Sequence, residues 1–378
     1  MSVELSSLIR VGTNKQIFAG QQLRTCLWGT STTETCTNGA LTVEYADAYW
    51  ASMQALTGSA LTLKHNYGHY GYTTAQIYDL LPSEYAADPD FDLAILQLAA
   101  NDIPNAGVDY ALVRNFVEYI LFRGKRIVLI VPYARVPNSV PERYIEFRNF
   151  CNSLIKLAPE LIYVVDFYSA ISETANPSQY LQPDFVHLNS KGAYAVGKAF
   201  SQAIGKIAGP FDFYPYGIGT MPLLGNVTPV EGFSASAGGT ISAPYEYQSG
   251  RLAVDFSITN SSSDNLFVTK SGITGLILGK KYRFVAEIQA KTESPVPCVY
   301  IRSGDSSVSR KMRDEDLCYF SPKTYANMAV GDKVSFASIP FIATAAEVSS
   351  IIMVVGFRNC TGKTFSTSIH YFDVVEAE

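Results

Sequence analysis

Four short segments of the chain carry side chains that could do chemistry together. In chain order they are WGTSTTE (Trp28–Glu34), HNYGHYG (His65–Gly71), LAANDI (Leu98–Ile103) and DFVHLN (Asp184–Asn189). They supply a serine, a turn glycine, an asparagine, and an aspartate three residues before a histidine. Acyl transfer needs a nucleophile, a base, a group that orients the base, and donors for an oxyanion. The four segments together contain all of these groups.

The elements that must position these groups alternate between strand and helix over the first two hundred residues. Apolar runs that predict strands buried on both faces cover Leu23–Trp28, Leu61–Asn66, Phe91–Ala99, Arg126–Tyr133 and Ile162–Tyr168. Helical spacing predicts helices over 43–58, 73–81, Tyr110–Phe122, Glu142–Lys156 and Ser190–Ile207. This alternation predicts an α/β fold with a doubly wound, flavodoxin-like, five-stranded parallel sheet.

The predicted sheet brings the chemical groups to one edge. Ser31, Gly68 and Asn101 fall just past the first, second and third strands. In an open parallel sheet, ligands bind in the crevice beyond the carboxyl ends of the strands. Asp184 and His187 lie in a loop before the last helix, which can return to the same edge. Singly, each residue could be a helix cap or a turn residue, so the prediction depends on the joint order and placement.

Residues of about 20–208 resemble the SGNH, or GDSL-type, hydrolases. Ser31 matches the serine of the first block, Gly68 the glycine of the N-x-G-x-x-G turn, and Asn101 the asparagine of the third block. Asp184 and His187 match the terminal D-x-x-H. Two positions depart from the family pattern: Thr30 replaces the aspartate of G-D-S, and Ala99 replaces the glycine of G-x-N-D.

The resemblance implies a role for each matched residue. Ser31 would be the nucleophile, His187 the base and Asp184 the residue that orients the base. The N–H groups of Ser31 and Gly68 and the side-chain amide of Asn101 would form the oxyanion hole. No metal or other cofactor is implied. Further candidates for contact with substrate are Thr30, Tyr70, Tyr133 and Arg135.

The composition changes after the last predicted helix, and short alternating strands follow. RLAVDFSIT, YRFVAEIQA and STSIHYFDVV alternate apolar and polar residues, which predicts an antiparallel sandwich, similar to a jelly roll. The expected organisation is an N-terminal arm (1–20), an SGNH hydrolase domain (21–208), a linker (209–225) and a β-sandwich (226–378). The sandwich is expected to be either carbohydrate-binding or an oligomerisation module.

Composition excludes several partners. The net charge is −5 and no run of Lys or Arg occurs, so nucleic acid is not expected as a partner. No stretch reaches the roughly 18 apolar residues of a membrane span, so membrane insertion is not expected. Four histidines and six cysteines without a CxxC pair predict no zinc cluster. Free buried thiols are favoured over a Cys26–Cys36 disulfide.

An esterase of this type joined to a sandwich resembles bacteriophage tailspike and tail-fibre deacetylases. That resemblance implies removal of O-acetyl groups from a polysaccharide of the bacterial capsule or O-antigen, and a homotrimeric assembly. The first residues form no apolar stretch long enough for a signal peptide. The expectation is therefore synthesis in the cytoplasm and action at the bacterial surface as a virion component.

Three other functions are open at this point. The chain could be a plant-polysaccharide acetyl esterase, a lipase or thioesterase that acts on longer acyl chains, or a non-catalytic sugar-binding adhesin. The polar, tyrosine-rich segments after the strands disfavour a long acyl chain, and the complete set of catalytic residue types disfavours the adhesin. Activity on esters with acyl chains of increasing length separates an acetyl esterase from a lipase or thioesterase.

Overall fold

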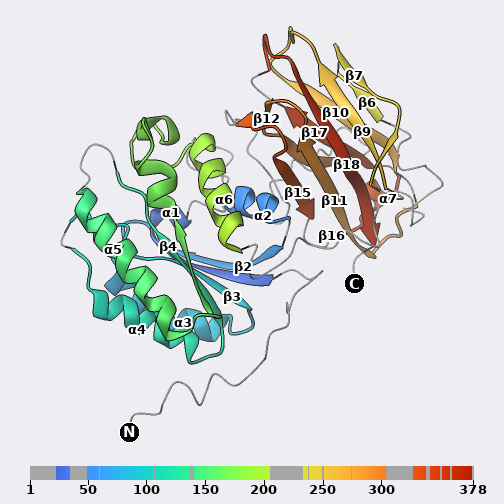
Figure 1. Ribbon diagram of the computed structural model, residues 1–378. Helices are drawn as coiled ribbons and strands as arrows, with labels where there is room; N and C mark the ends of the chain where they lie inside the picture. The colour runs from blue at the N-terminus through green and yellow to red at the C-terminus, as the bar shows by residue number, and fades with distance from the viewer. Residues whose placement is uncertain are drawn as a thin grey trace. The chain divides into compact units, whose positions relative to one another are not determined.

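The structure is a computed structural model (Figure 1). It describes residues 23–34, 49–58, 60–105, 107–135, 140–204, 233–236, 238–248, 251–273, 275–303, 327–337, 341–349, 351–357 and 360–376. The expected N-terminal arm and the linker lie outside these residues. The described residues fall into two compact units, one within 1–53 and 60–210 and the other within 54–59 and 211–378.

The first unit is built on one five-stranded sheet in which every pairing is parallel, in the order β2-β1-β3-β4-β5. Its strands are β1 (Leu23–Gly29), β2 (Leu61–Gly68), β3 (Leu93–Gln97), β4 (Arg126–Val131) and β5 (Ile162–Asp166). The predicted parallel sheet is confirmed. Since β1 lies between β2 and β3, the ends of the three motif-bearing strands are neighbours.

Helices cover both faces of this sheet (Figure 1). On one face, the apolar residues of β1, β3 and β4 pack against α3 (Thr74–Ala87), α4 (Tyr110–Leu121) and α5 (Pro141–Leu154). On the other face they pack against α2 (Tyr49–Leu56) and α6 (Ser190–Ile204). Short helical turns complete the unit: α1 (Ser31–Glu34), η2 (Ile155–Leu157), η3 (Tyr168–Ser172) and η4 (Pro177–Tyr180). Because a strand alternates its side chains between two apolar layers, it reads as continuously hydrophobic.

The largest difference from the predicted elements is the length of α3. The pattern TTAQIYDLL predicts an end at Leu81, but the helix continues past Pro82 to Ala87. Tertiary contacts explain the extension: Glu84 accepts a hydrogen bond from the Trp28 indole at 2.9 Å, and Tyr85 packs edge-on against Phe91. These contacts hold the last turn although Pro82 lacks an N–H for the helix ladder.

The second unit consists of antiparallel strands. A four-stranded sheet has the order β13-β17-β10-β6 and a larger sheet the order β15-β11-β18-β9-β7, with β16 beside β11 and β8 beside β9. The strands are β6 (Phe233–Ala235), β7 (Gly239–Ile241), β8 (Tyr245–Gln248), β9 (Arg251–Ile258), β10 (Leu266–Ile273), β11 (Lys281–Ala290), β12 (Ser294–Pro295), β13 (Cys298–Ser303), β14 (Asn327–Met328), β15 (Lys333–Ala337), β16 (Phe341–Ile342), β17 (Ile351–Phe357) and β18 (Phe365–Glu376). β12 pairs with β14, and α7 (Ala345–Ser349) is a short helix.

Aromatic side chains join the two larger sheets face to face. Phe357 of β17 stacks on Phe256 of β9 with ring centroids 5.4 Å apart, and it also contacts Phe365 of β18. Phe233 of β6 stacks on Phe372 of β18 at 5.7 Å. Each pair has one ring from each sheet, so the core of this unit lies between two antiparallel layers, as in a sandwich.

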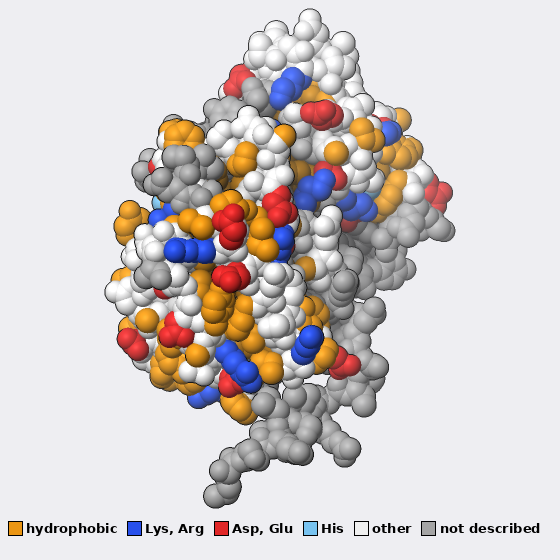
Figure 2. All heavy atoms as spheres, turned by 60° about the vertical axis from the view of Figure 1, so that its left-hand side comes forward, with side chains coloured by type: hydrophobic (Ala, Val, Ile, Leu, Met, Phe, Trp, Pro, Cys, Tyr) orange, Lys and Arg blue, Asp and Glu red, His pale blue; other side chains and the backbone are white. Residues whose placement is uncertain are grey.

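The surface carries charge of both signs. On the face drawn in Figure 2, acidic and basic side chains alternate over the molecule, with hydrophobic side chains between them. No helix among the described residues is long and apolar enough to cross a membrane.

Candidate active site

Ser31 begins α1, and one residue, Thr30, lies between it and the end of β1. The helix rests directly on the strand ends, because a β-carbon on Gly29 would overlap the Thr33 side chain and one on Gly68 would overlap the backbone nitrogen of Glu34. Gly29 and Gly68 are partners in the β1–β2 register. Two glycines opposite each other therefore provide the space in which the helix of the serine sits.

Side chains from the neighbouring strands fix α1 at both sides. Gln97, the last residue of β3, accepts hydrogen bonds at Oε1 from the hydroxyls of Thr32 and Thr33, both at 2.8 Å. Asn66 of β2 donates from Nδ2 to the carbonyl oxygens of Thr33 at 2.8 Å and Glu34 at 3.2 Å. The turn that carries Ser31 is thus bonded to the strands on both sides of β1.

A continuous chain of hydrogen-bonding groups joins the serine, the histidine and the aspartate. His187 Nε2 lies 3.2 Å from Ser31 Oγ, and His187 Nδ1 lies 2.7 Å from Asp184 Oδ2. Ser31 and His187 are buried, while the Asp184 side chain is partly exposed. This is the arrangement in which a histidine accepts a proton from a serine while a carboxylate holds the imidazole tautomer.

The Asp184 carboxylate is held in its charged form. Burial acts to raise its pKa, but the hydrogen bonds from the His187 side chain and from the N–H groups of His187 and Val186 outweigh burial. The pKa of Asp184 therefore lies below its usual range. Its Oδ1 accepts both backbone bonds, from Val186 at 2.9 Å and His187 at 3.0 Å.

The loop that carries the histidine is attached to the sheet. Tyr133, just past β4, donates its hydroxyl to the Val186 carbonyl oxygen at 3.0 Å. The Gln182 N–H donates to the His187 carbonyl oxygen at 2.8 Å. Within this loop Phe185 adopts a left-handed backbone with φ of +56° and has a side chain that is 43% exposed. Non-glycine residues rarely adopt this conformation, and such strain is concentrated at functional sites.

Asn101 lies in the turn after β3 with its amide bound at both ends. Nδ2 donates to the Tyr72 carbonyl oxygen at 2.8 Å, and Oδ1 accepts a hydrogen bond from Nη2 of Arg135. The residue is buried. Asp102 beside it accepts two bonds from Thr74, from the backbone N–H at 3.0 Å and the hydroxyl at 2.9 Å. The third motif is thereby connected to the start of α3.

The two glycines after Asn66 differ in what their N–H groups do. The Gly68 N–H, expected to face an oxyanion, donates to Asn66 Oδ1 at 3.0 Å. The Gly71 N–H has no acceptor among the residues that the structure describes. Gly71 has φ of +76°, which a glycine adopts without strain, and precedes Tyr72, whose carbonyl binds Asn101.

The four residues expected to contact substrate lie in different surroundings. Tyr70 is 72% exposed. Thr30 is buried, with its hydroxyl 3.4 Å from that of Thr32, and Tyr133 is buried and bonded to the histidine loop. Arg135 is bonded to Asn101. Three of the four are therefore part of the internal support of the site in this structure, and only Tyr70 has its ring in solvent.

Two residues whose side chains hold α1 in place, Gln97 and Asn66, are not among the candidate site residues that the sequence predicts. Gln97 lies within the predicted strand Phe91–Ala99, and Asn66 ends the predicted strand Leu61–Asn66 and begins the glycine turn. Both are hydrogen-bonding side chains at the ends of buried strands, a position at which a polar residue needs a partner. A polar residue at the end of a predicted buried strand is therefore the feature of the sequence that points to both residues.

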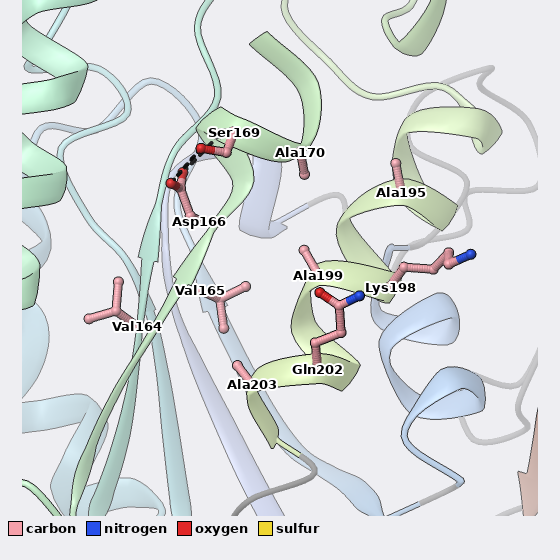
Figure 3. Close-up of a pocket in the computed structure, with 10 residues that line it drawn as sticks. All are labelled: Val164, Val165, Asp166, Ser169, Ala170, Ala195, Lys198, Ala199, Gln202 and Ala203. Atoms are coloured by element: carbon pink, nitrogen blue, oxygen red, sulfur yellow. Dashed lines mark hydrogen bonds between the residues drawn. The ribbon is translucent and has the colours of Figure 1, made fainter. Parts of the chain in front are cut away.

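A separate hollow of about 600 Å³ lies between the edge strand β5 and α6 (Figure 3). It is lined mainly by small side chains such as Ala199 and Ala203, with Lys198 at its margin. Figure 3 shows Ser169 bonded to Asp166 at one end, at 2.7 Å between Oγ and Oδ2. None of Ser31, Asp184 and His187 lines it.

The described cysteines and acidic groups offer no metal centre. Cys26, Cys151 and Cys360 are buried, and burial raises the pKa of the Cys26 thiol to about 12. Cys36, its alternative disulfide partner, lies outside the described residues. No group of three or more His, Cys, Asp or Glu residues that could hold a metal ion occurs within the described ranges.

Comparison with known protein families gives a match within the first unit. Residues 27–195 match the GDSL-like Lipase/Acylhydrolase family. This segment is a GDSL-like acylhydrolase domain. The matched range contains Ser31, Asn101, Asp184 and His187, and it ends inside α6. A search of curated proteins finds no match.

Solved structures similar to this chain cover about half of it. A lipase/acylhydrolase from Enterococcus faecalis is 22% identical, with a TM-score of 0.41 over 50% of this chain and 98% of that one. A family 3 carbohydrate esterase from Clostridium thermocellum is 15% identical, with a TM-score of 0.40 over 50% and 97%. Axe2, an acetylxylan esterase from Geobacillus stearothermophilus, is 20% identical, with a TM-score of 0.39 over 50% and 97%.

Proposed function

We propose that the GDSL-like domain is a serine esterase that removes O-acetyl groups from a polysaccharide. The observation that carries this proposal is the chain of contacts from Ser31 through His187 to Asp184, at 3.2 Å and 2.7 Å. Membership of an acylhydrolase family gives the reaction class. We propose in addition that the acyl group is acetyl and that the substrate is a polysaccharide.

In the proposed reaction, His187 Nε2 takes the proton of the Ser31 hydroxyl as Ser31 Oγ attacks the ester carbonyl carbon. The Asp184 carboxylate stabilises the imidazolium that forms. His187 then returns the proton to the alcohol oxygen of the sugar, which leaves as the acyl-enzyme forms. A water molecule, deprotonated by His187, attacks the acyl-enzyme and releases acetate and Ser31.

The developing oxyanion needs donors that are in place before the reaction. We assign this role to the Ser31 N–H, the Asn101 side-chain amide and the Gly71 N–H. Gly71 replaces Gly68 in this assignment because the Gly68 N–H is already bonded to Asn66. The Gly71 N–H has no acceptor among the described residues, so an incoming oxygen would displace none of these residues from it.

Exposed aromatic rings beside the motifs support a sugar as the substrate. Tyr70 and Tyr72, in the loop of Gly71, are 72% and 37% exposed, and Phe185, between Asp184 and His187, is 43% exposed. The His69 ring stacks on Tyr72 at 5.1 Å between centroids, which limits rotation of the Tyr72 ring. Flat, partly exposed rings suit the apolar faces of a sugar, and the hydroxyls of the two tyrosines can bond to its polar groups.

The test uses the intact protein and its Ser31→Ala variant on p-nitrophenyl esters of two to twelve carbons. Activity on the acetyl ester that is lost in Ser31→Ala supports the esterase. An optimum at eight or more carbons would instead favour the lipase or thioesterase alternative. Failure of all esters, with retained binding to polysaccharide, would favour the sugar-binding adhesin.

The source of the polysaccharide is tested separately. Bacterial capsule and O-antigen preparations and acetylated xylan are incubated with the protein, and acetate release is followed together with the NMR signals of the remaining acetyl groups. We propose a bacterial surface polysaccharide, in accordance with the expected virion tail component. Release from xylan alone would favour the plant-polysaccharide alternative.

A further inference from the structure

Arg135 holds the side chain of Asn101 at the end opposite to its donor. Arg135 lies just past the carboxyl end of β4, and its Nη2 donates to Asn101 Oδ1. One Nδ2 hydrogen of Asn101 is used by the Tyr72 carbonyl oxygen at 2.8 Å. Within the described residues, the second Nδ2 hydrogen has no acceptor. The Asn101 amide thus makes two hydrogen bonds, and one of its N–H groups has no acceptor among the described residues.

The guanidinium decides which way this amide faces. A flipped Asn101 would turn its NH₂ group toward Arg135, and two donors would then face each other. The same flip would set Oδ1 against the Tyr72 carbonyl oxygen, so two acceptors would also meet. Both contacts therefore favour the one orientation in which Nδ2 carries the unused hydrogen.

The charge of Arg135 adds to this geometric effect. No ion pair between Arg135 and a carboxylate occurs among the described residues, so its charge is not neutralised by a neighbour there. A cation that bonds to the carbonyl oxygen of an amide draws electron density from the nitrogen, and its N–H becomes a stronger donor. The planar guanidinium also presents its N–H groups in a fixed fork, a geometry that a lysine at this point would not reproduce.

We propose that Arg135 is a positioning residue, which orients and polarises the Asn101 amide so that its unused N–H meets the oxyanion of the ester. The inference rests on the proposed esterase function, because it assigns Asn101 to the oxyanion. It differs from the role of substrate contact that the sequence suggested for Arg135, and the two roles predict different kinetics.

The first experiment compares Arg135→Ala, Arg135→Lys and Arg135→Gln with wild type on the acetyl ester. We expect kcat of Arg135→Ala to fall between about tenfold and 100-fold, less than for loss of the donor itself, with KM within about twofold. Added guanidinium ion should restore part of kcat in Arg135→Ala but none in Asn101→Ala. A rise in KM with kcat unchanged would overturn the proposal in favour of substrate contact.

The double variant Arg135→Ala/Asn101→Ala tests whether the two residues act as one unit. We expect it to lose no more activity than Asn101→Ala alone, since Arg135 acts through the amide. Independent, multiplied losses would overturn the proposal. Arg143→Ala is the matched control, because Arg143 donates to the carbonyl oxygens of Ile103 and Asn105 in the same turn without touching the amide. Its kcat should stay within about threefold of wild type.

A second measurement needs no turnover. The Nδ2 resonances of Asn101, assigned by their loss in Asn101→Ala, should shift in Arg135→Gln and stay in place in Arg143→Ala. Unchanged resonances in Arg135→Gln would overturn the positioning role. If wild type hydrolyses no ester but the resonances shift, the proposed function fails while the contact that orients the amide stands.

Discussion

The imidazole of His187 and the hydroxyl of Ser31 lie 3.2 Å apart although 156 positions separate them in the chain. The serine follows β1 near the middle of the sheet, and the histidine precedes α6. Tyr133 joins the sheet to the loop of the histidine through its bond to Val186. The Tyr133 hydroxyl is thus one of the contacts that link the loop of the histidine to the sheet that carries the serine.

Ser31→Ala should abolish ester hydrolysis, by several orders of magnitude in kcat, because the nucleophile is lost. Circular dichroism and thermal unfolding should match wild type, since the Ser31 hydroxyl is replaced by hydrogen in a turn that other residues hold. Ser83→Ala, in α3, removes an equivalent hydroxyl away from the site and should keep full activity. Activity of Ser31→Ala within tenfold of wild type would reject Ser31 as nucleophile.

Asn101→Ala should lower kcat by about 10²–10³ with little change in KM, as expected for a donor that acts in the transition state. Asn101→Asp is the sharper comparison. It keeps an oxygen for Arg135 but has no N–H for the oxyanion, so we expect a loss of kcat at least as large. Steady-state kinetics of both variants on the acetyl ester check this. A fall in affinity alone would assign Asn101 to substrate binding.

Gly68→Ala and Gly71→Ala should differ in their effect on stability. A β-carbon at Gly68 overlaps the backbone of α1, so we expect a loss of about 1–3 kcal/mol or more in the free energy of unfolding, together with loss of activity. At Gly71, apart from its chain neighbours, no atom of the described residues lies within 4 Å of such a carbon, and the left-handed backbone opposes it, at about 1–2 kcal/mol. Urea denaturation and ester hydrolysis measure both. Equal effects would contradict the packing of α1 against Gly68.

Glu287 should make the second unit sensitive to acid. Its carboxylate accepts bonds from Ser335 and His370 and pairs with Lys333, each at 3.0 Å. Burial acts to raise the pKa of Glu287, but the hydrogen bond from His370 and the charge of Lys333 lower it below its usual value. A lowered folded pKa gives stability that is complete above the unfolded pKa of about 4.3 and is lost as the pH falls through the folded value.

The measurement compares thermal unfolding of wild type and Glu287→Gln at pH 7 and at about pH 3. Wild type should unfold at a clearly higher temperature than the variant at pH 7, and the gap should narrow in acid. Glu246→Gln, which removes an exposed carboxylate of the same unit, controls for the change in net charge. A gap that is the same at both pH values would show that the Glu287 charge does not contribute.

The sheet was predictable because burial on both faces leaves a strong pattern. Phe91–Ala99 reads as one apolar run, and its central part, Leu93–Gln97, is buried at every position. Ala99, just beyond, has φ of +65°, a conformation that the family's glycine would adopt without strain. The departure from the family pattern was visible in the sequence, but the left-handed backbone at Ala99 was not.

The details of the site were not predictable in the same way. Arg135 and Asn101 have no periodic relation, and their contact depends on how the turns after two adjacent strands are folded. The choice between the N–H groups of Gly68 and Gly71 depends on where the Asn66 side chain points. A motif names residue types, whereas these hydrogen bonds follow from rotamers and loop conformations that tertiary packing determines.

Gly29 and Gly68 have a mechanical consequence. Because neither has a side chain, α1 lies directly on the backbone of β1 and of its neighbour, the edge strand β2, and at these two positions no side chain separates α1 from the sheet. The turn of the serine is therefore packed directly on the sheet, while Tyr70, Tyr72 and Phe185 are partly or largely exposed in the loops. A lineage could therefore exchange the exposed aromatic residues of these loops and leave the turn of the serine beneath them unaltered.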